Sequence, residues 1–288
     1  MAEVDVVLVG GTGFIGQALA RRLVQQGQRV SIVSRRADAE IPAGCTLVAD
    51  GTLPVARAVV NLAGAPIATR WSAKSWERIE SSRLELTRTL VESFAFDPPE
   101  VFVCASAVGF YGDRGDTPLT EEEPSGPDRA ALLCAEWEAI AEQAEELGVR
   151  VARARLGIVL GDGGALAAMR RPFKAGLGGP LGSGRQWLPW IHLDDTTRAL
   201  MLAMERLSGP LNVVAPHPVR QGEFARALGR TLGRPAVLPV PQFALKLALG
   251  DAAGLLLASQ RALPTALLDE DFTFEHPHVE GALTALLG

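Results

Sequence analysis

The feature that most constrains the fold is a glycine-rich turn between an apolar run and an amphipathic segment. Residues 4–9 are a short run rich in β-branched residues, and GGTGFIG follows it. From residue 14 to residue 24, apolar residues recur at helical spacing. A glycine triplet alone would also fit an ordinary tight turn. The order strand, turn, helix instead favours a dinucleotide site, where the backbone approaches a pyrophosphate at the helix N-terminus. The expected contacts are Gly10, Thr12, Gly13, Phe14, Ile15 and Gly16.

Further nearly continuous apolar runs predict more buried parallel strands. These runs are residues 29–34, 58–62, 101–105 and 149–156. Long helical patterns lie between them at residues 72–94 and 128–147. The alternation predicts an α/β fold built on a Rossmann-type doubly wound parallel sheet.

The second half of the chain has a different composition and pattern. Glycine- and proline-rich loops begin at residue 161, followed by helical patterns at residues 193–206, 221–232 and 243–257 and a short strand at residues 211–214. We therefore predict an NADP(H)-binding Rossmann domain over residues 1–160. A smaller C-terminal substrate-binding lobe is expected over residues 161–288, and the two can interleave along the chain.

Composition narrows the expected partners. The formal net charge is -5 and no dense Lys/Arg run occurs, which argues against nucleic acid and anionic membranes as partners. Three scattered cysteines without CxxC spacing fit a reducing cytoplasm, and no apolar stretch is long enough to span a bilayer. We expect a cytoplasmic protein with a small-molecule substrate, with a homodimer as an option.

The end of the second predicted strand bears on the choice of dinucleotide. An acidic residue there would bind the ribose 2′-hydroxyl and repel a 2′-phosphate, but the strand ends in Ser34, Arg35 and Arg36. Two guanidinium groups can bind a phosphate, so NADP(H) is favoured over NAD(H). The alternative is that both arginines are solvated loop charges. Asp50, which ends LVAD, could meet the adenine or simply cap a turn.

Other cofactor contacts are expected at the ends of later strands. VNLAG ends one of them with small residues, which would let the backbone lie close to the cofactor ribose and phosphates. The expected contacts are Asn61, Leu62, Ala63, Gly64, Ala105 and Leu156.

Four motifs, GGTGFIG, VNLAGAP, SAVGFYG and LPWIHLDD, occur in the order seen in extended short-chain dehydrogenases/reductases, and the chain resembles that family. More narrowly, it resembles the atypical NAD(P)-dependent epimerase/dehydratase-like branch labelled "epimerase family protein". That match includes CAEWEAIA, ARLGIVLG and DEDFTFEHP, and it covers essentially the whole chain. The resemblance implies a Rossmann core, a bound nicotinamide dinucleotide, and a Ser/Thr, Tyr, Lys trio whose tyrosine acts as acid or base.

The sequence departs from that trio. The YxxxK motif is absent: Tyr111 is the only tyrosine, and the motif's positions on the expected helix hold Ala130 and Cys134. Relatives place the serine at the position of Ala107, and a shift to Ser106 turns a strand side chain to the opposite face. Tyr111 and Ser106 are nevertheless the candidate catalytic residues. The resemblance puts Tyr111 in a pocket near the nicotinamide, and the alternative is a buried phenol with its hydrogen bonds satisfied.

Two further features leave alternatives open. Glu138 follows Trp137, and an apolar neighbour could raise its pKa, although a glutamate on a helix surface is the commoner case. Trp187 and Trp190 follow a glycine-rich loop and could form a wall of the substrate pocket or anchor the two lobes.

The histidines are expected to be structural. His192, Asp194 and Asp195 should cap the helix that begins near residue 193 and link the lobes. His276 and His278 flank Pro277 without a third ligand at metal spacing, so no metal site is expected.

Taken together, these features favour an NADP(H)-binding oxidoreductase that reduces a small carbonyl or enone. The absent Tyr-Lys pair favours instead a catalytically silent NADP(H)-binding redox sensor. A nucleotide-sugar-type epimerase or dehydratase ranks lower because that chemistry depends on the missing tyrosine.

Overall fold

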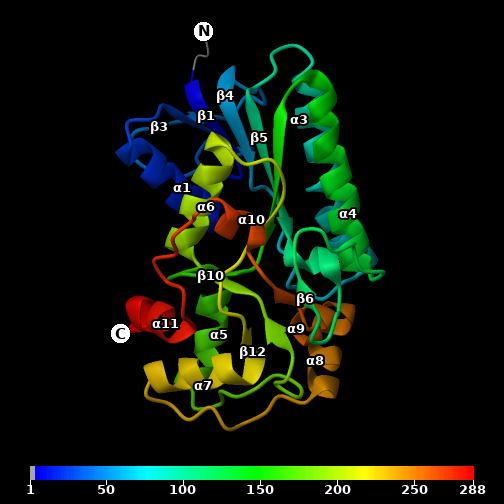
Figure 1. Ribbon diagram of the computed structural model, residues 1–288, viewed down its shortest axis with the longest axis vertical. Helices are drawn as coiled ribbons and strands as arrows, with labels where there is room; N and C mark the ends of the chain where they lie inside the picture. Colours follow the sequence, from blue (N-terminus) through cyan, green and yellow to red (C-terminus); the bar gives the residue numbers. More distant parts are fainter. Residues whose placement is uncertain (1–3) are drawn as a thin grey trace.

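The computed structural model of the chain describes residues 4–288. Its main feature is a seven-stranded parallel sheet in the order β11-β7-β5-β4-β1-β2-β3, which confirms the predicted Rossmann-type fold (Figure 1). The strands are β1 (Val4–Val9), β2 (Val30–Val33), β3 (Cys45–Val48), β4 (Ala56–Asn61), β5 (Val101–Ala107), β7 (Arg150–Leu156) and β11 (Gly209–Val213). β1 lies between β2 and β4, so the strand order reverses there, and the crevice at such a point is where open α/β sheets bind ligands.

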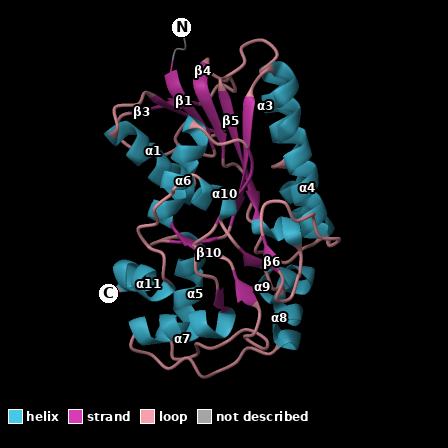
Figure 2. Cartoon of the chain, viewed as in Figure 1, coloured by secondary structure: helices cyan, strands magenta, loops and turns pink. Residues whose placement is uncertain are grey.

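Both faces of the sheet are covered because its strands are apolar on both sides. Alternate β1 residues enter different cores: Val6 and Leu8 pack beneath α1 (Phe14–Gln25) and α6 (Leu193–Glu205). Val7 and Val9 pack on the other face, toward α3 (Leu84–Ser93) and α4 (Arg129–Glu142). Figure 2 shows these helices on either side of the strands.

The prediction of one continuous helix over residues 72–94 is wrong. This segment forms two helices, α2 (Ala73–Ser81) and α3, separated at Ser82 and Arg83. The Ser82 hydroxyl accepts a hydrogen bond from Ala65 N, and Arg83 Nη1 donates to Ala65 O. These bonds hold the loop after β4 against the break, so the interruption has a tertiary cause that helical periodicity does not contain.

The second lobe lies below the sheet in Figure 1 and has its own apolar core. Short strands pair within it or at its border, and helices α5, α7 and α11 surround the core. The strands are β6 (Pro118–Leu119), β8 (Ile158–Leu160), β9 (Trp187–Leu188), β10 (Trp190–His192), β12 (Val219–Arg220) and β13 (Arg261–Ala262). The helices of this lobe are α5 (Gly164–Lys174), α7 (Gln221–Thr231), α8 (Gln242–Leu249), α9 (Gly254–Leu257) and α11 (Val279–Leu287). The short helix α10 (Thr265–Asp269) packs instead against β11 in the core of the main sheet.

Other boundaries also differ from the expected ones. The helix expected over residues 243–257 is divided, because Gly250 has a positive φ of 60° after α8. The pattern at residues 128–147 is α4 followed by the 3-10 turn η2 (Gln143–Leu147). No strand was expected at β3, a four-residue element at the sheet edge.

The two lobes interleave along the sequence. β11 and α6 both follow residue 160, yet β11 pairs with β7 in the main sheet and α6 packs in its core. The chain thus returns to the first lobe after entering the second. Within residues 4–288, no helix is both long and apolar enough to cross a bilayer.

Candidate functional site

The glycine turn brings the ends of β1 and β4 unusually close. Gly10 has a φ of +82°, and a methyl group on its Cα would lie 2.6 Å from Ala63 N. At Gly16 a methyl group would lie 2.5 Å from Gly10 O, and Gly13 N donates to Gly10 O at 3.0 Å. The contacts at Gly10 and Gly16 leave no room for a Cβ, so the turn requires glycine at these two positions.

The N-terminus of α1 opens at this turn. Gly13 is the N-cap residue and no side chain caps the helix there. The first helical turn therefore has N–H groups without partners inside the helix, a ready site for phosphate oxygens. Thr12 is half-buried beside it. The Phe14 ring packs on the loop of residues 161–164 and not in the turn. A methyl group at Gly161 would lie 2.6 Å from Phe14 Cζ. Phe14 thus offers its backbone to this site.

Asn61 holds the loop after β4 in place. Its side chain is buried, Nδ2 donates to Thr87 Oγ1 at 3.0 Å, and Oδ1 accepts from Ala63 N at 3.1 Å. Leu62 N donates to Val9 O at 2.8 Å, which ties the same loop to the end of β1. Asn61 accordingly positions the backbone of residues 62–63 toward the glycine turn. Gly64 lies against Arg83, where a methyl group would be 3.0 Å from Nη2.

The arginines after β2 are exposed. Arg35 and Arg36 make no ion pair within the described chain, and Arg36 N donates to Ser34 Oγ at 3.2 Å. Both guanidinium groups are accessible to a ligand. Asp50 is also exposed, but its carboxylate accepts hydrogen bonds from the N–H and hydroxyl of Thr52, which lowers its pKa. Asp50 thus caps a turn.

Ala105 and Leu156 lie toward the carboxyl ends of β5 and β7, at the same edge of the sheet as the glycine turn. Ala105 is buried and Leu156 is half-buried between the two main cores.

Ser106 faces a buried ion pair. Its Oγ donates to Glu138 Oε1 at 2.6 Å, and Glu138 Oε2 lies 2.8 Å from Arg155 Nη2. The expectation that Glu138 is a surface glutamate is wrong: only 4% of it is exposed. Ser106 is 3% exposed, so its hydroxyl is a partner of Glu138 rather than an open group in a pocket.

Tyr111 is buried and its hydroxyl is fully engaged. The hydroxyl donates to Asn212 Oδ1 at 2.7 Å, with Thr120 O a second acceptor at 3.0 Å, and accepts from Arg155 Nη1 at 2.9 Å. Burial raises its pKa to about 12. The pocket-lining position that the resemblance implies is therefore not observed, because Tyr111 has no exposed surface. The structure instead shows the other possibility raised by the sequence, a buried phenol with its hydrogen bonds satisfied.

The same polar network contains residues that sequence reasoning missed. Arg155 also donates to Glu121 O at 3.0 Å and stacks over the Phe110 ring at 3.6 Å. Glu121 Oε1 accepts from Asn212 N at 3.0 Å, and burial raises the pKa of Glu121. The sequence contained one signal of this network, an arginine within the apolar pattern of β7, because a buried charge needs a partner.

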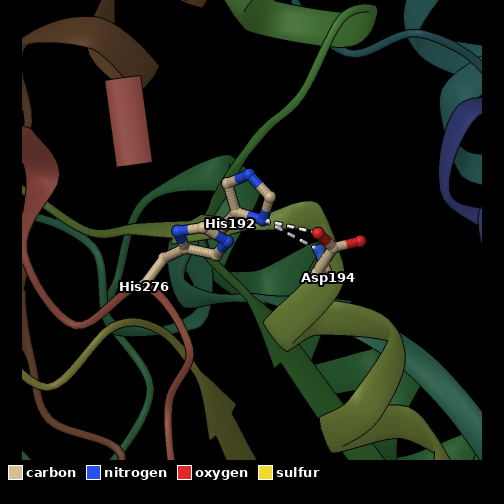
Figure 3. A group of neighbouring side chains, drawn as sticks. All are labelled: His192, Asp194 and His276. Atoms are coloured by element: carbon tan, nitrogen blue, oxygen red, sulfur yellow. Dashed lines mark hydrogen bonds and ion pairs between the residues drawn. The ribbon is translucent and has the colours of Figure 1, made fainter. Parts of the chain in front are cut away.

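Figure 3 shows His192, Asp194 and His276 together. His192 Nδ1 accepts from Asp194 N at 3.1 Å and caps α6, as expected. Asp195 accepts from Glu275 N and His276 N, so this region also joins α6 to the segment that precedes α11.

The three side chains have ligand atoms within 4.8 Å of one another. The two imidazole rings lie against each other, with centroids 3.7 Å apart and planes tilted by 33°.

The tryptophans serve as anchors. Trp190 is buried in the core of the second lobe. Trp187 Nε1 donates to Asp116 Oδ1 at 3.0 Å, which ties the second lobe to the loop after the 3-10 turn η1 (Val108–Tyr111).

Comparison with known proteins accords with this geometry. The model of the NAD dependent epimerase/dehydratase family matches residues 6–214. The chain belongs to this family. A second model, a domain of unknown function (DUF1731), matches residues 240–286, so the epimerase-family chain has the expected C-terminal extension.

Relatives cover nearly the full length of the chain. An epimerase family protein SDR39U1 homolog of Arabidopsis thaliana is 40% identical, over 99% of this chain and 87% of the relative. Epimerase family protein YfhF of Bacillus subtilis is 38% identical, over 98% of each chain. The crystal structure of human epimerase family protein SDR39U1 with NADPH aligns with a TM-score of 0.90 and 35% identity, covering 98% of this chain and 99% of the human one.

Proposed function

We propose that this epimerase-family protein binds NADP(H) in the crevice at the carboxyl ends of β1, β2 and β4. The observation that carries the proposal is the glycine turn, whose uncapped helix N-terminus opens beside the loop after β4. Exposed Arg35 and Arg36 are suitable partners for a 2′-phosphate. NADPH in the human relative supports the same ligand.

Calorimetric titration with NADPH and NADH tests the site. We expect Arg35→Gln and Arg36→Gln each to weaken NADPH binding by about tenfold, since a hydrogen bond to a charged group contributes about 1.5–3 kcal/mol. NADH affinity should hardly change. Arg88→Gln, an exposed arginine on α3, is the control and should bind NADPH normally. Equal affinities for NADPH and NADH in the unaltered protein would refute the 2′-phosphate assignment.

The reaction that this site supports best is reduction of a small carbonyl or enone. When bound, a reduced nicotinamide supplies a hydride to the electrophilic carbon of the substrate. We assign to water the proton that completes the alcohol or the saturated ketone. Neither Tyr111 nor Ser106 is placed to give it, since both hydroxyls are buried and already bonded. The chain's contribution is to hold cofactor and substrate in position.

A second candidate is a silent NADP(H)-binding protein whose partners respond to the cofactor's redox state. The specific observation that favours it is the buried Tyr111, together with Ala130 and Cys134 at the positions of the usual pair. Epimerase or dehydratase chemistry ranks third, because it depends on the tyrosine that this site lacks.

A screen of carbonyl compounds, read by NADPH fluorescence, separates these candidates. Consumption of NADPH by one substrate class would support the reductase. In that case Tyr111→Phe should retain turnover once corrected for folded fraction, because the phenol is not the proton source. Tight NADPH binding with no consumption across the library would favour the silent binder.

A further inference from the structure

We propose that the second lobe has its own binding site for a small phosphate-bearing ligand, separate from the cofactor crevice. The site is a cavity of about 310 Å³ between the loop of residues 183–185 and the start of α7. Three arginines line it, Arg185, Arg220 and Arg226, against one carboxylate, Glu223. This volume is at the small end of the range for ligand sites.

The charged side chains that line this cavity differ in whether they have a partner. Arg185 and Arg226 are exposed and form no ion pair within the described part of the chain. Glu223 Oε2 accepts from Arg220 N at 2.8 Å, so the one lining carboxylate is engaged by the backbone at the start of α7. An anion entering the cavity would thus meet two unpaired guanidinium groups.

Arg220 is already held in position. Its guanidinium lies 3.9 Å from the centroid of the Trp187 ring, and Nη1 lies 2.7 Å from Asp116 Oδ1. Nη1 also donates to Arg185 O, so this group joins two sides of the cavity. A guanidinium fixed before binding loses less side-chain entropy when a ligand arrives.

The backbone keeps the cavity open. Gly184 has a φ of +67°, and its carbonyl accepts from Gly222 N at 2.8 Å. A methyl group at Gly222 would lie 3.1 Å from Gly184 O, so a larger residue would crowd this wall. Ser183 Oγ accepts from Arg185 N at 3.2 Å, which leaves the Ser183 hydroxyl proton to donate to a ligand.

The combination of guanidinium groups and a hydroxyl donor specifies the ligand class. A phosphate monoester presents three terminal oxygens and carries nearly two negative charges, which matches several converging donors. A monocarboxylate offers fewer acceptors and one charge. Free inorganic phosphate and the phosphate of a metabolite share the recognised chemistry.

Calorimetry of NADPH-loaded protein with inorganic phosphate, glycerol 3-phosphate and acetate tests the site. We expect both phosphates to bind and acetate to bind at least about tenfold more weakly. Tighter binding of glycerol 3-phosphate would identify a metabolite site, and tighter binding of inorganic phosphate a free-anion site. Arg185→Gln and Arg226→Gln should each weaken phosphate binding by about tenfold. Arg230→Gln, on the same helix but 3.4 Å from Glu280, is the matched control and should bind normally.

A parallel titration of the Arg35→Gln variant without NADPH separates this site from the cofactor crevice. Retained phosphate binding there would support the proposal even if NADP(H) binding itself failed. The proposal is overturned if the unaltered protein binds neither phosphate, or if Arg226→Gln and Arg230→Gln lose affinity equally.

Discussion

At the scale of single residues, Gly10 is subject to two constraints at once. It has a positive φ, and its missing Cβ makes room for the backbone at Ala63. Gly27 has nearly the same φ, +79°, but nothing lies within 4 Å of the position of its Cβ. This pair can therefore distinguish backbone strain from the steric role of the turn.

We expect Gly27→Ala to lower the free energy of unfolding by about 1–2 kcal/mol, the cost of a left-handed conformation. Gly10→Ala should cost more and should also weaken NADPH binding by at least about tenfold, because the turn has to move. Urea unfolding and NADPH titration measure the two effects. Equal losses of stability and unchanged NADPH affinity in both variants would show that the contact at Ala63 has no functional importance.

At the scale of elements, two ion pairs join β7 to α4 in contrasting surroundings. Arg155 and Glu138 are both 5% exposed in their side chains, whereas Arg153 pairs at 3.0 Å with Glu142, whose side chain is 50% exposed. The partners are two residues apart on the strand and one turn apart on the helix. Coulombic attraction, desolvation and solvent screening therefore differ between the pairs while the elements stay the same.

We expect Arg155→Met to destabilise the fold by about 3–5 kcal/mol, because it leaves a buried carboxylate without its partner. Arg153→Met should cost about 1 kcal/mol or less, as for a partly screened pair. Unfolding in urea, monitored by circular dichroism, gives both values. Similar costs for the two variants would mean that burial does not control the strength of these pairs.

The sequence predicted the major strands of the sheet because their apolar runs are long. It could also have placed Glu138, since Cys134, Trp137 and Ala141 lie on the same buried face of α4. The break between α2 and α3 was not predictable, because contacts with residue 65 produce it. The glycine turn was identifiable locally, whereas the partners of Tyr111 lie up to 101 residues away and required the fold.

At the scale of the whole molecule, the junction between α6 and the C-terminal segment contains buried titratable groups. His192 is 4% exposed and its ring lies against that of His276, with Asp194, Asp195 and Glu275 around it. Burial, assisted by His276, lowers the pKa of His192 despite these carboxylates. Below the ordinary histidine pKa, the unfolded chain therefore takes up a proton that the folded chain resists.

We accordingly expect the free energy of unfolding to fall as the pH drops from about 7 to about 5. His192→Asn should reduce this fall, because asparagine keeps a capping acceptor but does not titrate. Urea unfolding at both pH values checks this, with exposed His217→Asn as control. An undiminished pH dependence in His192→Asn would exclude His192 as its source.

The interleaving of the two lobes also affects the order in which the protein can mature during synthesis. β7 ends at residue 156, but its outer neighbour β11 begins only at residue 209. A nascent chain that has emerged only to residue 160 therefore has β7 with one edge unpaired. Such edges invite association with other chains, so the ribosome-bound intermediate needs protection until residues 209–213 arrive.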